Sequence, residues 1–186
     1  MPSTFESQAS NSFQGPQFQT SEFEGPEFGE EEASRIFAGS KYPSERNSSS
    51  KNSVQFDWPV NEATMTRGYN SKGRGHWGLD LAHRRGSPIL SAENGVVIYT
   101  GSGFRGYGKL IVVEHGNDWA TLYSHLSKIL VREGQTVDRG QKIGLMGRTG
   151  HATGVHLHFE IRHYRKPVDP LAHLPKVNGS IADTKH

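Results

Sequence analysis

The chain has 186 residues, of which 22 are glycine and none is cysteine, with a mean hydropathy of −0.66 and a formal net charge of +2. The lack of cysteine excludes disulfides, thiolate metal sites and cysteine nucleophiles, so any metal would be bound by His, Asp or Glu. No stretch approaches the roughly 20 apolar residues of a membrane-spanning helix, and the first residues lack the pattern of a secretory signal.

Charge and composition divide the chain into unequal parts. Residues 1–50 carry eight acidic and three basic side chains, whereas residues 51–186 carry 11 acidic and 18 basic ones and all ten histidines. Ser, Gln, Glu, Gly and Pro dominate residues 1–55, so we expect a disordered acidic segment there, either a linker or an inhibitory pro-segment. The remainder suffices for one core. We predict a single domain over residues 56–175 and a flexible tail over residues 176–186.

The domain is predicted to be all-β and antiparallel, because short β-branched runs alternate with glycine-rich turns. No long amphipathic helix is expected, and at most a turn forms over residues 127–129. Two stretches, 86–97 and 134–144, resemble each other, and each looks like half of a barrel-sandwich hybrid. The predicted strands cover residues 88–90, 95–100, 110–115, 119–125, 142–146 and 155–162.

Biotinyl and lipoyl carrier domains also use the barrel-sandwich hybrid, which makes a carrier function an alternative. Such a carrier needs a modifiable lysine at a hairpin tip, usually beside a methionine. The corresponding sequence here is Met146-Gly147-Arg148, which has no lysine. A carrier function is therefore disfavoured.

The first group of reactive side chains lies in the sequence His76-Trp77-Gly78-Leu79-Asp80. On an extended segment, residues four apart face the same side, so His76 and Asp80 share one side while Leu79 faces the core. Gly78 leaves room between them. Either polar residue alone would be an ordinary surface or turn residue, but together they match part of a metal site.

The second candidate is His125, at the end of the predicted strand 119–125. Leu122 and Leu126 flank it in a pattern that is compatible with a core edge, so a packed structural histidine is a real alternative. Beside a metal site, the same imidazole would orient or deprotonate a water molecule and stabilise a developing oxyanion.

The third group is His156-Leu157-His158-Phe159-Glu160. Alternate residues of a strand share a face, so both imidazoles point one way while Leu157 and Phe159 point into the core. The spacing does not decide which histidine would be the metal ligand. Glu160 shares their face and either fixes the tautomer of a histidine ring or pairs with a nearby arginine.

These three motifs, in this order, resemble those of the M23 (lysostaphin or LytM-like) zinc metallopeptidases, which cut peptide cross-links of bacterial peptidoglycan. The resemblance extends over about residues 58–174. The family's His-x-Gly-x-Asp, Tyr-x-His-Leu and His-Leu-His-Phe-Glu motifs correspond to residues 76–80, 123–126 and 156–160. The resemblance implies a duplicated hybrid motif with a substrate groove across a twisted antiparallel sheet. It also implies zinc bound by His76, Asp80 and His158, with His125 and His156 as the catalytic imidazoles.

The implied function is that of a monomeric zinc metalloendopeptidase in the cell envelope, acting on peptidoglycan and not on nucleic acid. Within the family, the alternative is a non-catalytic activator of other wall hydrolases, a role filled when one of the five site residues is lost. All five are present here, which favours the enzyme. The chain departs from the family pattern at Trp77, at Val155 and in the short loop 68–75, none of which removes a ligand.

The other histidines are expected to have no catalytic role. His115 precedes the turn Gly116-Asn117-Asp118 and is interpreted as structural. His151 lies just before the strand that carries His156 and could line the groove. We also expect His83, His163 and His173 to be exposed.

Overall fold

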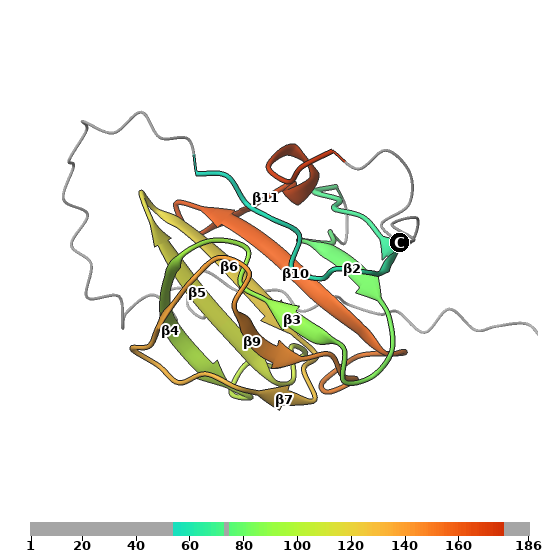
Figure 1. Ribbon diagram of the computed structural model, residues 1–186. Helices are drawn as coiled ribbons and strands as arrows, with labels where there is room; N and C mark the ends of the chain where they lie inside the picture. Colours follow the sequence, from blue (N-terminus) through green and yellow to red (C-terminus); the bar gives the residue numbers. More distant parts are fainter. Residues whose placement is uncertain (1–53, 73–74, 177–186) are drawn as a thin grey trace, which may run out of the picture.

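The computed structural model describes residues 54–72 and 75–176, which form an all-β antiparallel fold (Figure 1). The predicted segment 1–55 and tail 176–186 lie almost wholly outside these residues. The elements are β1 (Thr64–Arg67), β2 (Leu79–Ala82), β3 (Pro88–Leu90), β4 (Gly95–Gly101), β5 (Leu110–Gly116), β6 (Trp119–Ser124), β7 (Lys128–Ile129), β8 (Thr136–Val137), β9 (Lys142–Leu145), β10 (His156–His163), β11 (Lys166–Val168) and the short 3-10 helix η1 (Pro170–Ala172).

The strands form two sheets. The larger has the order β1-β2-β10-β6-β5-β4-β8, with β11 pairing with β10, and the smaller has the order β3-β9-β7. In Figure 1 the small sheet lies in front of the large one. The two stretches that resemble each other in sequence pair with each other twice, through β3–β9 and through β4–β8. This exchange of strands agrees with a duplicated motif, and the predicted all-β fold is confirmed.

No helix forms over residues 127–129, where at most a turn is expected. Lys128 and Ile129 form β7, in which Lys128 pairs with Leu145 and Ile129 with Gly144. A two-residue strand carries no periodicity of its own, so pairing with β9 determines its conformation.

The main core fills the space between the two sheets. Alternation along β10 places Leu157, Phe159 and Ile161 in this core, each fully buried. The small sheet contributes Ile89 and Ile143 from the other side. The intervening side chains of β10 therefore point to the opposite face of the large sheet.

That opposite face is only partly apolar. A smaller cluster of buried residues, which includes Tyr107 and Leu122, packs against it. Leu122 lies directly opposite Glu160 in the β6–β10 ladder, so the apolar cluster borders the polar side chains of β10. One face of the large sheet thus serves the core, and the other carries the polar residues predicted from the sequence.

Candidate metal centre

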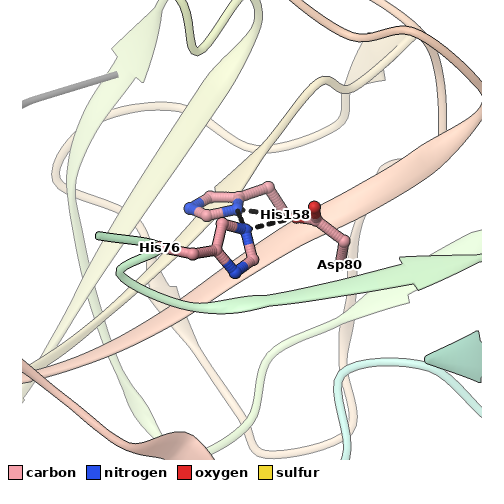
Figure 2. A group of neighbouring side chains, drawn as sticks. All are labelled: His76, Asp80 and His158. Atoms are coloured by element: carbon pink, nitrogen blue, oxygen red, sulfur yellow. Dashed lines mark hydrogen bonds and ion pairs between the residues drawn. The ribbon is translucent and has the colours of Figure 1, made fainter. Parts of the chain in front are cut away.

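Two side chains from residues 76–80 and one from β10 meet on this polar face (Figure 2). His76 Nε2 lies 3.0 Å from Asp80 Oδ1, Asp80 Oδ1 lies 2.8 Å from His158 Nδ1, and the two nitrogens are 3.2 Å apart. A tetrahedral zinc ion with bonds of about 2.0–2.2 Å keeps its ligand atoms roughly 3.3 Å apart. The triangle therefore has dimensions that fit one metal ion. Among the described residues, His76, Asp80 and His158 are the group of side chains that could hold a metal ion.

Backbone pairing determines the positions of these three residues. Asp80 on β2 and His158 on β10 are directly opposite each other in the antiparallel ladder. His76 precedes β2, and its backbone forms two hydrogen bonds with Asn70, of 2.8 and 2.7 Å. Leu79 is fully buried in the core, so alternation along β2 turns Asp80 toward the site.

Gly78 allows the two strands to come this close. A Cβ atom at position 78 would lie 2.2 Å from the backbone oxygen of Phe159 and 3.0 Å from Cγ of Glu160. Glycine is therefore required by the approach of β10, and not only by the space between His76 and Asp80.

His125 follows the last residue of β6 and has a backbone φ of 60°. This left-handed conformation is uncommon for residues other than glycine and is often found at functional sites. The backbone N–H of His125 donates to the carbonyl of Tyr107 at 2.9 Å. The ring centroid lies 4.7 Å from that of His156 and 6.1 Å from that of His158, so the three imidazoles form one group.

Backbone carbonyls determine which ring nitrogen carries the proton in three of the histidines. Nδ1 of His76 donates to the carbonyl of Gly68 at 2.8 Å, and Nδ1 of His125 donates to that of Thr149 at 2.8 Å. Nδ1 of His156 lies 3.1 Å from its acceptor, the carbonyl of Gly154. In a neutral imidazole, an Nδ1–H donor leaves Nε2 as an acceptor.

The two alternatives for Glu160 both occur. Its Oε1 accepts a hydrogen bond from His158 Nε2 at 3.1 Å, and its Oε2 accepts from Nε and Nη2 of Arg162 at 2.8 and 2.7 Å. Burial would raise the pKa of Glu160, but Arg162, His158 and Tyr107 outweigh it and lower the pKa to about 2. Glu160 is therefore ionised at neutral pH.

The three atoms of the triangle attract positive charge. Burial would raise the pKa of Asp80, yet its contacts with His158 and His76 hold the pKa well below its usual range. Burial lowers the pKa of His158, but Asp80 and Glu160 outweigh it and raise the pKa to about 9. Three acceptor atoms that converge on one point repel each other unless a proton or a cation lies between them. A metal ion would replace the proton that His158 otherwise holds.

His125 has the opposite tendency. Burial is the main cause that lowers its pKa to about 4, with His158 and His156 adding to the effect. At neutral pH its imidazole is therefore uncharged, and Nε2 is able to accept a proton. His156 Nε2 lies 3.7 Å from Asp80 Oδ1, farther than His158 Nδ1. The structure thus brings all five predicted residues together and places His158, rather than His156, in the triangle.

The other histidines lie away from this group or at its margin. His115 is bonded to the carbonyl of Asn94 and to Thr121 Oγ1, which agrees with a structural role. His151 is exposed. His83 is only half-buried, as are His163 and His173, so the expected exposure is wrong for these three. The rings of His163 and His173 pack against Trp119 at centroid distances of 4.0 and 4.9 Å.

Sequence reasoning missed Tyr107, which lies between Gly106 and Gly108 in the loop before β5. Its hydroxyl donates to Glu160 Oε1 at 2.6 Å, and the centroid of its ring lies 5.9 Å from that of His158. The sequence feature that could have indicated Tyr107 is its position between two glycines. Both glycines adopt positive φ. Such a tight glycine-flanked loop brings its central side chain close to the sheet.

Comparison with known proteins gives a consistent result. The profile of peptidase family M23 matches residues 74–170. The chain is 46% identical over 119 residues to a "Lipoprotein NlpD/LppB homolog" of Pseudomonas aeruginosa. It is 41% identical over 119 residues to the "Murein hydrolase activator NlpD" of Escherichia coli. Both matches cover 64% of this chain, but only 39% and 31% of the relatives, so the chain spans well under half of their length.

Solved structures share the fold. A zinc-containing peptidase from Vibrio cholerae matches with a TM-score of 0.62 and 40% identity, over 66% of this chain and 41% of the other. The catalytic domain of lysostaphin from Staphylococcus simulans matches with a TM-score of 0.54 and 29% identity, over 59% of this chain and 90% of the other. Within the described residues, no helix has the length and apolar character needed to cross a membrane.

Proposed function

Because the chain belongs to peptidase family M23, we propose that it is a zinc-dependent endopeptidase that hydrolyses peptide cross-links of bacterial peptidoglycan. The zinc ligands in this proposal are His76, Asp80 and His158, and the catalytic imidazoles are His125 and His156. The P. aeruginosa and E. coli relatives are named as a lipoprotein and as a murein hydrolase activator, which supports a location in the cell envelope.

One observation supports this proposal most strongly. The triangle of His76 Nε2, Asp80 Oδ1 and His158 Nδ1 has sides of 2.8–3.2 Å, a separation that suits three ligand atoms of one metal ion. Two nitrogens and one carboxylate oxygen form a common catalytic zinc set that leaves a fourth position open. These residues would hold a zinc ion, which would supply Lewis acidity to the scissile carbonyl and lower the pKa of the attacking water.

The remaining imidazoles provide the proton transfers. His125 is neutral at working pH, and its Nε2 is available because Nδ1 donates to Thr149. It would accept the proton of the attacking water as general base. His156, whose ring lies 4.7 Å from that of His125, would in its doubly protonated form donate from Nε2 and stabilise the negative charge that develops on the carbonyl oxygen. Either ring could then pass a proton to the leaving amine.

A second candidate function is activation of another wall hydrolase, which the name of the E. coli relative favours. Such an activator would not need the catalytic histidines. In the present chain all five site residues are retained in one cluster, which favours hydrolysis.

The decisive experiment is digestion of purified peptidoglycans of different cross-link types, with zinc or with a chelator, followed by identification of the new termini. We expect the native protein to release new amino and carboxyl termini only with zinc. His125→Ala should still bind zinc, because His125 is outside the ligand triangle, but should lose about 10²-fold or more of the rate.

The same preparations distinguish the two functions. If the native protein releases no termini from any substrate but increases the activity of a wall amidase, and His125→Ala does so equally, the peptidase proposal is wrong and activation is correct. If chelation leaves the hydrolysis rate unchanged, the zinc mechanism is wrong.

A further inference from the structure

Behind the metal centre lies a buried chain of polar side chains that a zinc site does not require by itself. Glu160 is fully buried, and Tyr107 and Arg162 are 1% and 3% exposed. Tyr107 donates to Oε1 of Glu160 at 2.6 Å, and Arg162 donates to Oε2 through two nitrogens. Among the described residues, the carboxylate has one other hydrogen-bond partner, His158 Nε2, at 3.1 Å.

These contacts leave the carboxylate little freedom to rotate. Two N–H groups of Arg162 bind one oxygen, while the hydroxyl of Tyr107 and the ring of His158 bind the other. Because each oxygen is bound by a different set of donors, the carboxylate cannot rotate without breaking hydrogen bonds to charged or buried partners. Burial of a carboxylate without such partners would be costly. Loss of any of these hydrogen bonds is therefore unfavourable, and the carboxylate keeps its orientation.

We propose that Tyr107 and Arg162 are positioning residues that act through Glu160, orienting its carboxylate so that His158 holds its proton on Nε2 and presents Nδ1 to the metal. His158 differs in this respect from His76, His125 and His156, whose Nδ1 atoms face backbone carbonyls. A histidine in the tautomer of those three would have its lone pair on the wrong nitrogen. The inference rests on the metal centre of the proposed function and does not depend on hydrolysis.

Tyr107 has a second connection to the site. Its carbonyl accepts the backbone N–H of His125 at 2.9 Å, at the residue where the backbone is left-handed. One residue therefore supports a metal ligand through its hydroxyl and a proposed catalytic imidazole through its backbone. Removal of the hydroxyl affects only the first connection, so the two effects can be separated.

The test compares zinc affinity among single substitutions, measured by competition with a chelating dye. Partners of metal-ligating histidines typically contribute about 10–100-fold to metal affinity. We expect Glu160→Gln to weaken zinc binding by an amount in this range. Tyr107→Phe and Arg162→Lys, which each keep the bulk of the side chain, should weaken it by about tenfold.

Tyr123→Phe is the matched control. Tyr123 is also fully buried and hydrogen-bonded, to Thr121 and to the backbone of Ala92, but it lies on the core face of the sheet. Its substitution should lower stability and leave zinc affinity unchanged. If Tyr107→Phe and Arg162→Lys bind zinc as tightly as Tyr123→Phe does, the inference is wrong.

A spectroscopic measurement on the native protein avoids any effect of substitution on folding. In the zinc-loaded protein with 15N-labelled histidine, nitrogen shifts distinguish a metal-bound nitrogen from a protonated one. We expect one ligand histidine bound through Nδ1, with a protonated Nε2, and the other bound through Nε2. Two histidines bound through Nε2 would overturn the inference. A protein that binds zinc in the expected way but cuts no peptidoglycan would refute the proposed activity alone.

Discussion

Replacement of Gly78 with alanine (Gly78→Ala) should separate β10 from the segment that carries His76 and Asp80. The new Cβ would lie 2.2 Å from the backbone oxygen of Phe159, whereas ordinary contacts begin near 3.4 Å. The strands must therefore move apart by about 1 Å, because a backbone carbonyl within a paired strand cannot turn aside.

The magnitude follows from the cost of overpacking, which is about 1–3 kcal/mol. At roughly 4 °C per kcal/mol for a domain of this size, Tm should fall by about 4–12 °C. His158 moves with β10, so the ligand triangle widens as the strands separate. If all of the strain is relieved at the metal centre, the Kd for zinc rises by up to about 100-fold. Calorimetric melting and dye competition measure the two effects separately.

Gly68→Ala is the control, since Gly68 lies in the same region and its carbonyl binds His76, yet a Cβ there would meet nothing within 4 Å. We expect Tm and zinc affinity close to those of the native protein. If Gly78→Ala behaves like Gly68→Ala on both measurements, the strand approach does not determine the ligand geometry and the reasoning is refuted.

Three further predictions concern single side chains. Asp80→Asn removes the proposed anionic ligand, so the rise in Tm that we expect zinc to give the native protein should disappear. An undiminished rise would mean that Asp80 is not a ligand. Ser124 Oγ is buried and has no hydrogen-bond partner among the described residues, so Ser124→Ala should raise the free energy of unfolding by about 1 kcal/mol, and urea titration showing a loss would contradict this. Burial lowers the pKa of His115 to about 4. Between pH 6.5 and 4 the unfolded chain binds a proton that the folded chain does not. The free energy of unfolding therefore falls as the pH falls, by up to about 1.4 kcal/mol per pH unit. Urea titrations across this range should show a shallower fall for His115→Gln than for the native protein, and equal slopes would exclude this residue as the cause.

The fold could be predicted where strands have strong apolar character. The strand predicted over residues 88–90 has the bounds of β3, and the one predicted over residues 110–115 differs from β5 by one residue. Strand β1 was missed because all four of its residues are exposed, so no alternation marks it. Strand β8 has only two residues, too few for a periodic signal. Such short strands form because a neighbour offers hydrogen bonds.

The candidate site could be predicted as a set of residues, but not as a geometry. Strand parity correctly placed His156 and His158 on one face, since β10 covers both. The choice between them depends on the register of β10 against β2, which sets His158 opposite Asp80. The carbonyl partners that determine each tautomer come from loops with no sequence motif. The roles of the five residues stay a prediction.

Residues of the core and residues of the site alternate one by one along β10, and this has a consequence for how such proteins diverge. Substitution of His156 or His158 leaves Leu157 and Phe159 in the core, where both are fully buried. A gene copy can therefore lose its chemistry through single point mutations without losing its fold or its surface shape. A copy that has lost its activity can regain it by equally few changes, because the strands that position the site residues have been kept.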